Sequence, residues 1–306
     1  MGIVSASVRA GLLGWSVAVC LLSAIPAKAA EFAIVGPRAT GMGGAGVAVT
    51  TDSMATYWNP AGLAMESSLD IQVAQASLQG IDRLGVKDTL DDIDSLDLTD
   101  TSLLNQARLQ NLLNKLNEPG TSLSAIGSAG LYAKGSIGNF ALGFNASDVA
   151  TGGMFLPDPV SVTVGSSLTI NGDFTIQGLE ARQVGLSYAY ALPSRTLAIG
   201  ATTKIIQGAA YLGNVGVAGA NGDLRFTDDL GKAELSTAMG VDAGVMLRPA
   251  SWLHLGVVGK DLNEPTFDTP GGQKFKLNPQ VRGGVAIVPY PALTLSFDGD
   301  ITSNRT

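Results

Sequence analysis

The chain has 306 residues, a mean hydropathy of +0.25 and a formal net charge of −7 at pH 7. This acidic balance gives no basic surface for nucleic acid, so we expect no nucleic-acid partner. Cys20 and His254 are the only residues of their kinds, which excludes a disulfide within the chain and a histidine cluster for a metal. No nucleophile motif accompanies His254, so we expect no enzyme, no catalytic residues and no cofactor.

Residues 1–29 have the features of a secretory signal. An apolar run from Gly11 to Ile25 follows a single charge, Arg9, and leads to the small-x-small triplet Ala27-Lys28-Ala29. The run is shorter than the roughly 20 residues that a spanning helix needs. We therefore expect cleavage after Ala29 and export, which removes the cysteine and leaves 17 basic and 26 acidic residues.

Residues 30–66 form a glycine-dense segment that is too rich in small residues to bury a core of its own. Its glycines match the spacing of a dinucleotide-binding loop, but no strand–helix–strand unit surrounds them. The Asn59-Pro60 step is a turn signal. We predict that the segment is a plug that folds inside a barrel and gates it. The predicted plug and gate residues are Gly41, Gly43, Gly46, Asn59, Pro60, Ala61 and Gly62.

Beyond residue 66 the sequence alternates between large apolar residues and small or polar ones. Between Gln183 and Tyr190, for example, Val184, Leu186 and Tyr188 share one face. No stretch is apolar for the about 18 residues of a helical span, so we predict an all-β, antiparallel transmembrane barrel over residues 67–306. A soluble sandwich alternates too, but its outer face carries more charge. The predicted strands are residues 67–78, 124–134, 139–147, 181–192, 196–208, 233–247, 252–260, 279–288 and 293–301.

The connections between these strands alternate between long and short, which is typical of outer-membrane barrels. The first long connection, residues 79–123, contains an acidic run from Asp88 to Asp100 and a predicted helix near residues 102–117. The acidic run lacks the glycine at which a calcium loop turns, so we interpret it as a solvated face. Residues 148–180 are predicted to form another long connection.

Six charged side chains fall on the small-residue faces of the predicted strands, where they would point into the lumen. We expect ion pairs among them, which either brace the wall or select what passes. Because the same faces carry small residues, a substitution such as Gly200→Ser is predicted to be mild. The six lumen-facing charges are Lys204, Asp242, Arg248, Arg282, Asp298 and Asp300.

Four segments, in their order along the chain, resemble a known family. They are ATGMGGAGVAVTTDSMATYWNPAGLAM from Ala39, GKDLNEPTFD from Gly259, PQVRGGVA from Pro279 and FDGDIT from Phe297. The first is similar to the lumenal plug of FadL-type outer-membrane barrels, and together they are similar to conjugal-transfer TraF-like proteins, a branch of that superfamily. The resemblance implies a FadL-like barrel in the outer membrane, in contact with its lipid.

The resemblance also implies more strands than nine, and bacterial single-chain barrels have an even number. The sequence ends at Asn304-Arg305-Thr306 without a terminal aromatic residue. We therefore expect a C-terminally truncated chain and an incomplete barrel.

Two functions remain open. The first is a passive channel in which a hydrophobic small molecule displaces the plug near Asn59-Pro60-Ala61. The second is a non-transporting envelope component that supports conjugal transfer and contacts transfer-apparatus proteins through its long loops. In the first case uptake of the solute depends on the plug, and in the second it does not.

Overall fold

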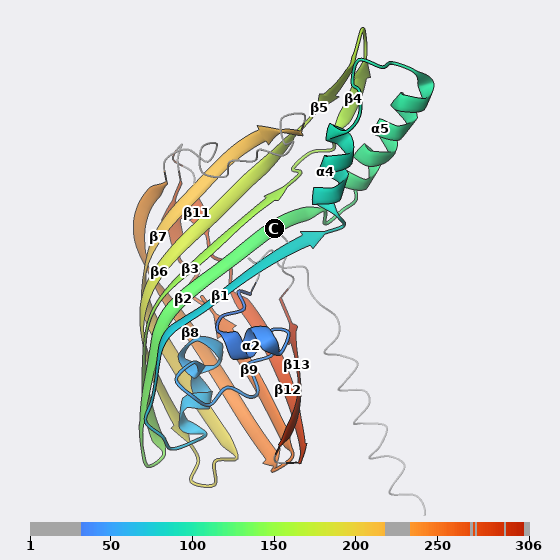
Figure 1. Cartoon of the computed structure of the whole chain (residues 1–306). Coiled ribbons are helices and arrows are strands. Elements are labelled where there is room, and N and C mark those ends of the chain that lie inside the picture. Colours follow the sequence, from blue (N-terminus) through green and yellow to red (C-terminus); the bar gives the residue numbers. More distant parts are fainter. Residues whose placement is uncertain (1–31, 218–232, 270–271, 273, 291, 303–306) are drawn as a thin grey trace, which may run out of the picture.

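The computed structural model describes residues 32–217, 233–269, 272, 274–290 and 292–302 (Figure 1). The predicted signal, residues 1–29, lies outside these residues, as does its cleavage site. In the part of the chain that is described, no helix is both long enough and apolar enough to cross a membrane.

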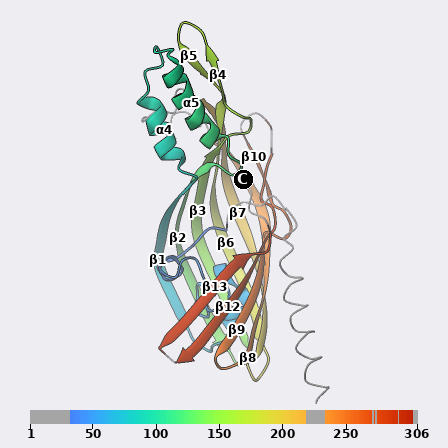
Figure 2. The same cartoon turned by 90° about the vertical axis from the view of Figure 1, so that its right-hand side faces the viewer.

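The core of the fold is a nine-stranded antiparallel sheet in which each strand pairs with the next one in the sheet along the chain. The sheet curls into a half-barrel (Figures 1 and 2). Its strands, in order, are β1 (Asp70–Arg83), β2 (Ser122–Ile137), β3 (Phe140–Phe155), β6 (Asp173–Ala191), β7 (Leu197–Gly216), β8 (Glu234–Ala250), β9 (Leu253–Lys260), β12 (Gln280–Tyr290) and β13 (Leu293–Asp300). The nine predicted strands are all present in the predicted order, which confirms the all-β class.

Several strands are longer than the sequence alternation predicts. β6 and β7 stay paired from Ala191 with Ala198 as far as Asp173 with Gly216, well beyond the predicted ends. The prediction was too short because backbone pairing continues where the outward side chains become polar, as at Glu180.

The predicted long connection over residues 148–180 is therefore mostly strand. The remaining residues hold a small hairpin of β4 (Ser161–Val164) and β5 (Leu168–Asn171). A second two-stranded hairpin, β10 (Thr266–Asp268) with β11 (Lys274–Lys276), follows β9.

Two helices and the β4–β5 hairpin project beyond one end of the sheet as a unit that we call the head, residues 84–121 and 156–172 (Figures 1 and 2). Helix α5 (Leu103–Leu116) matches the predicted helix, and the Ser102 hydroxyl caps it by accepting a hydrogen bond from the Asn105 N–H. Helix α4 (Val86–Asp94) was not predicted, because its aspartates hide the helical spacing of its three buried apolar residues. These are Val86, Leu90 and Ile93, which join the leucines of α5 in one apolar cluster.

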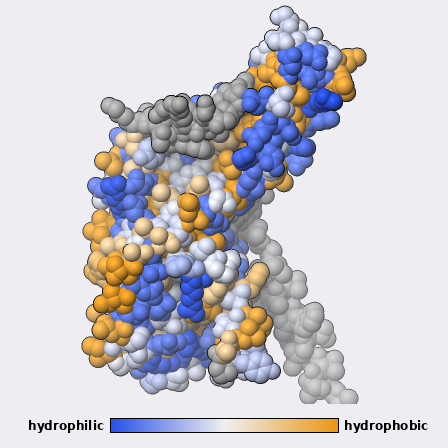
Figure 3. All heavy atoms as spheres, viewed as in Figure 1, coloured by the Kyte–Doolittle hydropathy of each residue, from blue (hydrophilic) through white to orange (hydrophobic). Residues whose placement is uncertain are grey.

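The strand register separates two kinds of side chain onto the two faces of the sheet. On the convex face, apolar side chains form a row across five neighbouring strands. The row consists of Leu197, Leu247, Leu255, Val285 and Phe297. Apolar residues gather along this outer surface in Figure 3. Phe297 is 75% exposed, although a side chain of its kind is usually buried in a water-soluble domain.

The next residue along each strand points to the concave face, where most side chains are small. The corresponding row consists of Ala198, Met246, Gly256, Gly284 and Asp298. The first two are almost completely buried, at 1% and 0% exposure, although both lie at the surface of the sheet itself. They are covered by a segment that precedes the first strand.

Candidate functional site

The segment that covers the concave face is residues 32–65, which we call the N-terminal segment. It contains α2 (Pro37–Gly41), α3 (Ala55–Trp58) and the 3₁₀ helix η1 (Pro60–Ala64), and it lies within the curl of the sheet (Figures 1 and 2). Every residue from Gly44 to Met65 is buried except Asp52, whereas most of α2 is exposed. The second half of the segment is therefore enclosed by the curled nine-stranded sheet, which we call the wall.

Three aromatic residues organise the segment. Phe32 lies with its ring centroid 5.5 Å from Trp58 and 6.1 Å from Tyr57. The Tyr57 hydroxyl donates to the Ala33 carbonyl at 2.8 Å, and the Trp58 Nε1–H donates to the Val35 carbonyl at 2.9 Å. Burial raises the pKa of the Tyr57 hydroxyl well above its usual value, so the group stays a neutral donor. These bonds tie the start of the segment to α3.

Glycines in the wall let the segment approach at backbone distance. A Cβ atom at Gly200 would overlap the backbone of Pro60 and Ala61, and one at Gly256 would lie 2.5 Å from the Val47 carbonyl oxygen. Any side chain at these positions would push the segment away. Five wall glycines at which an added Cβ atom would meet a backbone or side-chain atom of the segment form what we call the glycine track. They are Gly143, Gly200, Gly244, Gly256 and Gly284, on β3, β7, β8, β9 and β12.

Asn59 joins the segment to itself and to the wall. Its Nδ2 donates to the carbonyl oxygen of Val47 at 3.0 Å and to that of Val245 on β8 at 3.1 Å, while its Oδ1 accepts from the Ala61 N–H at 3.2 Å. The side chain is completely buried. Position 62 requires glycine, because a Cβ atom there would overlap the Thr50 carbonyl oxygen.

Two charged wall residues hold the segment from strands near opposite edges of the sheet. The Asp298 Oδ2 on β13 accepts from the N–H groups of Gly46 and Val47 at 2.7 and 2.8 Å. Lys134 on β2 donates to the carbonyl oxygens of Thr51, Leu63 and Glu66. Hydrogen bonds to charged groups are roughly twice as strong as neutral ones. The segment is therefore clamped at its middle and at its end.

A buried ion cluster lies beside α3. The Lys204 Nζ on β7 pairs with Asp242 at 2.9 Å and with Asp261 at 2.9 Å, and the Asp261 N–H donates to Asp242 at 2.8 Å. Lys260 lies next to this cluster, with its Nζ 3.0 Å from the ring centroid of Tyr57 and 4.7 Å from that of Phe32. These contacts join the wall cations to the aromatic residues of the segment.

The remaining predicted charges lie toward the rim of the site. Arg282 forms two hydrogen bonds to Asp300 and places its guanidinium 4.2 Å from the Phe32 ring centroid. Arg248 contacts Glu66 at 3.4 Å in a partly exposed pair. All six predicted lumen charges thus occur on the concave face, but they divide between the buried cluster, the clamp and the rim.

The predicted plug glycines differ among themselves. Gly46 packs against the Trp58 ring and gives its N–H to Asp298, so it belongs to the docked part. A Cβ atom added at Gly41 or Gly43 would meet nothing within 4 Å, and Gly43 has a left-handed φ of 66°. These two glycines lie in and just after the exposed helix α2, where an added side chain would touch no wall residue.

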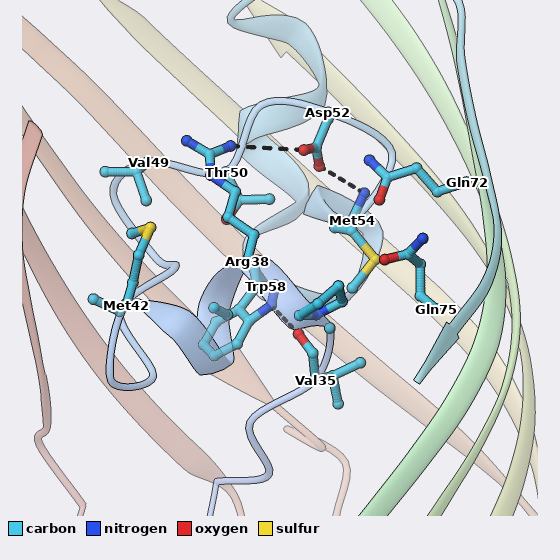
Figure 4. A pocket seen from close by; sticks show the side chains of 14 residues that line it. Val35, Arg38, Met42, Val49, Thr50, Asp52, Met54, Trp58, Gln72 and Gln75 are labelled. Atoms are coloured by element: carbon cyan, nitrogen blue, oxygen red, sulfur yellow. Dashed lines mark hydrogen bonds and ion pairs between the residues drawn. The ribbon is translucent and has the colours of Figure 1, made fainter. Parts of the chain in front are cut away.

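A small cavity of about 30 Å³ lies between α2, α3 and β1 (Figure 4). Arg38 and Asp52 line it and pair with each other at 3.7 Å, so their charges compensate each other. The Trp58 ring forms part of its apolar lining. Among the described residues, no group of three or more His, Cys, Asp or Glu side chains could hold a metal ion.

Sequence reasoning missed Lys134 and Lys260 as site residues. Each is the last residue of a predicted strand, where a lysine is expected to reach solvent. Both are instead 4% exposed or less. Strand β2 continues beyond Lys134. Lys260 lies an even number of residues from Val258 and Gly256, and this spacing was the signal that could have placed it on the concave face.

A family model described as "F plasmid transfer operon, TraF, protein" matches residues 56–300 of the chain. The match begins within α3 and ends at the last residue of β13, so it includes the whole nine-stranded sheet, Asn59 and the glycine track. No curated protein and no solved structure matches the chain.

Proposed function

The chain belongs to the F plasmid transfer operon TraF family, and we propose that it acts in the outer membrane as a plugged β-barrel protein of the FadL superfamily. In this proposal the curled sheet is the barrel wall, its convex face contacts lipid, and residues 30–66 are the plug. The plug gates passive passage of a hydrophobic small molecule.

The observation that carries the proposal is the docking of the N-terminal segment on the glycine track. A segment that merely filled space would tolerate side chains on the wall, but here the backbones of Pro60 and Val47 lie where Cβ atoms would otherwise be. Beside the apolar clusters that the segment shares with the wall, the contact has separate polar anchors, namely Asn59, Asp298 and Lys134. Separate hydrogen bonds can be broken one at a time, as a gate requires.

The convex face supports the membrane part of the proposal. Three side chains of its apolar row, Leu247, Val285 and Phe297, are exposed, which would be costly in water but is favourable against acyl chains. A protein of this kind also needs its backbone groups paired, and the antiparallel register pairs each of the nine described strands with its neighbours in the sheet.

Planar-bilayer recording tests the gate. Deletion of residues 41–62 is expected to raise single-channel conductance, because it removes the segment docked on the wall. Asn59→Ala is expected to leave the conductance level unchanged and to make brief openings more frequent. Unchanged conductance after the deletion would contradict gating by this segment.

The head favours a second candidate, a non-transporting envelope component that supports conjugal transfer. It has its own apolar cluster and projects away from the sheet (Figure 1). Deletion of residues 86–116 would then reduce mating frequency while solute uptake stays the same. A deletion that lowers uptake and leaves mating unchanged would reject this second role.

A further inference from the structure

The convex face of β3 and β6 is apolar and exposed between the short turns and the middle of the two strands. Leu142 and Leu186 are each 64% exposed there. The end near the turns is aromatic, since the ring centroid of Phe140 lies 6.0 Å from that of Tyr188 and 5.0 Å from that of Tyr190. We call this part of the face the bare stretch. It comprises Phe140, Leu142, Phe144 and Ala146 on β3 and Val184, Leu186, Tyr188 and Tyr190 on β6.

Three charged residues end the bare stretch on both strands. Asp148 of β3 is paired in register with Arg182 of β6, and their charged groups lie 3.5 Å apart. Glu180, at the next convex position of β6, contacts Arg182 at 2.6 Å. We call Asp148, Glu180 and Arg182 the charged break. Because it interrupts two neighbouring strands at one register position, it is a feature of the face and not of a single strand.

Beyond the charged break the convex face becomes apolar again, and there the head covers it. Met154 of β3 and Ile176 of β6 are paired in register and lie on the same face as the bare stretch. Together with Phe174 they are 3% exposed or less, because they join the buried residues of α4 and α5 in one apolar cluster. Apolar surface is unfavourable in water, so a protein cover is expected on a part of the face that lies in water. The bare stretch has no such cover among the described residues.

The length of the bare stretch matches a membrane. At about 3.4 Å per residue, Tyr190 and Arg182 lie about 27 Å apart along β6. Barrel strands are tilted by about 35–45°, so this length corresponds to about 20 Å along the membrane normal, close to the apolar band of about 25 Å on outer-membrane barrels. Aromatic residues are also typical of the edge of such a band, where Phe140, Tyr188 and Tyr190 lie.

We propose that a lipid bilayer covers the convex face of β3 and β6 from the aromatic end of the bare stretch to the charged break, where the headgroups of the leaflet nearer the head contact Asp148, Glu180 and Arg182. The proposal rests on the proposed membrane function and adds where the membrane ends. Strand β6 continues for about 30 Å from Arg182 to Asp173, so the head stands in water beyond the lipid. This position is the reason that α4 and α5 cover the apolar ends of β3 and β6.

Fluorescence quenching in phosphatidylcholine vesicles tests the boundary. The full chain with Cys20→Ser carries one added cysteine, labelled with an environment-sensitive fluorophore, and is reconstituted in the vesicles. Leu142→Cys and Ala150→Cys are exposed on the same face of β3, on either side of the charged break, and Ala107→Cys on the head is the control in water. The ratio of quenching by a nitroxide lipid to quenching by iodide is expected to be at least fivefold higher at position 142 than at position 150. Position 150 should match position 107.

The possible failures are distinguishable. Equal ratios at positions 142 and 150, both well above that at position 107, would overturn the boundary and leave the membrane function intact. A ratio at position 142 as low as that at position 107 would show that the bare stretch lies in water, which rejects the membrane function itself.

A double variant tests the role of the charged break. With Asp148→Leu and Arg182→Leu the apolar face extends toward the head, so the quenching ratio at position 150 is expected to rise at least twofold. Lys87→Leu with Asp91→Leu removes an exposed ion pair of the head and is the matched control, which should leave the ratio unchanged. An unchanged ratio at position 150 in both double variants would show that the charged break does not set the boundary.

Discussion

On the convex face of the sheet, the side chains of Val257 and Phe297 are exposed, whereas one residue away Gly256 and Asp298 contact the backbone of the N-terminal segment. The same strands therefore meet two different environments. The convex face needs only apolar character, so many side chains would serve there. The concave face needs particular residues, because a single added carbon atom or a lost carboxylate disturbs a specific backbone contact. The two faces should therefore be sensitive to different substitutions: the convex face to an added charge, and the concave face to added size or to the loss of a carboxylate.

The largest effect is expected from a charge on the convex face. Leu255→Arg should destabilise the membrane-inserted protein by about 2–4 kcal/mol if the site lies near the middle of the bilayer. Leu197→Arg, in the same row, should behave alike. The measurement is a urea titration of folding into lipid vesicles.

The matched control for this charge is Leu103→Arg, at a leucine of the head that is 84% exposed. It should cost almost nothing because the head lies outside the proposed membrane region. If the control and Leu255→Arg cost the same free energy, the convex face contacts water and the membrane interpretation is wrong.

A side chain on the glycine track should have the next largest effect. Gly200→Val would overlap the backbone of Pro60 and Ala61 and should cost about 1–3 kcal/mol, the usual range for overpacking. Limited proteolysis should then cleave the N-terminal segment faster. Gly135→Val is the control, since nothing lies within 4 Å of a Cβ atom there. Equal protease resistance of the two variants would show that the track does not hold the segment.

Removal of the clamp charge should have a smaller effect. Asp298→Asn keeps the shape of the side chain but weakens two charge-assisted hydrogen bonds, at a cost of about 1 kcal/mol. Hydrogen exchange at the Gly46 and Val47 amides should accelerate about fivefold. Asp88→Asn on the exposed face of α4 should leave both amides unaffected. Unchanged exchange in Asp298→Asn would remove Asp298 from the clamp.

The smallest effect is expected at the rim. Glu66→Gln breaks the contact with Arg248, in which the Glu66 side chain is 58% exposed. Exposed ion pairs contribute about 0–1 kcal/mol, and this one has a long 3.4 Å contact, so the change should be below about 0.5 kcal/mol. A loss above about 1 kcal/mol in the same urea titration would show that the Glu66–Arg248 pair helps to hold the segment, as Asp298 and Lys134 do.

The two faces also differ in how much of them could be predicted from the sequence. The alternation around Val184 and Leu186 predicted the strands and their order because period two follows directly from backbone geometry. The prediction that Gly200→Ser is mild was wrong. It rested on the size of the neighbouring side chains, whereas the constraint at Gly200 comes from the backbone of Pro60, 140 residues away in the sequence.

Residues at turns and at the ends of strands were the hardest to predict. Asn59 was recognised from its turn signal, but its bond to the Val245 carbonyl depends on the tertiary fold. Lys134 and Lys260 were assigned to strand ends and were therefore missed. Helix α4 was hidden because its aspartates face solvent and only three of its residues join the apolar cluster. For Asn59, Lys134 and Lys260 the decisive partner lies far away along the chain.

The most direct test of the account is a cross-link between the N-terminal segment and the wall. Ala48 of the segment and Ala286 of β12 lie in the same buried cluster. In a Cys20→Ser background, the double variant Ala48→Cys, Ala286→Cys should form an intramolecular disulfide on oxidation in intact outer membranes. A control pair, Ala48→Cys with Ala107→Cys on the exposed face of α5, should remain reduced. Failure of the first pair to cross-link, or equal cross-linking of both pairs, would contradict a segment docked inside the curled sheet.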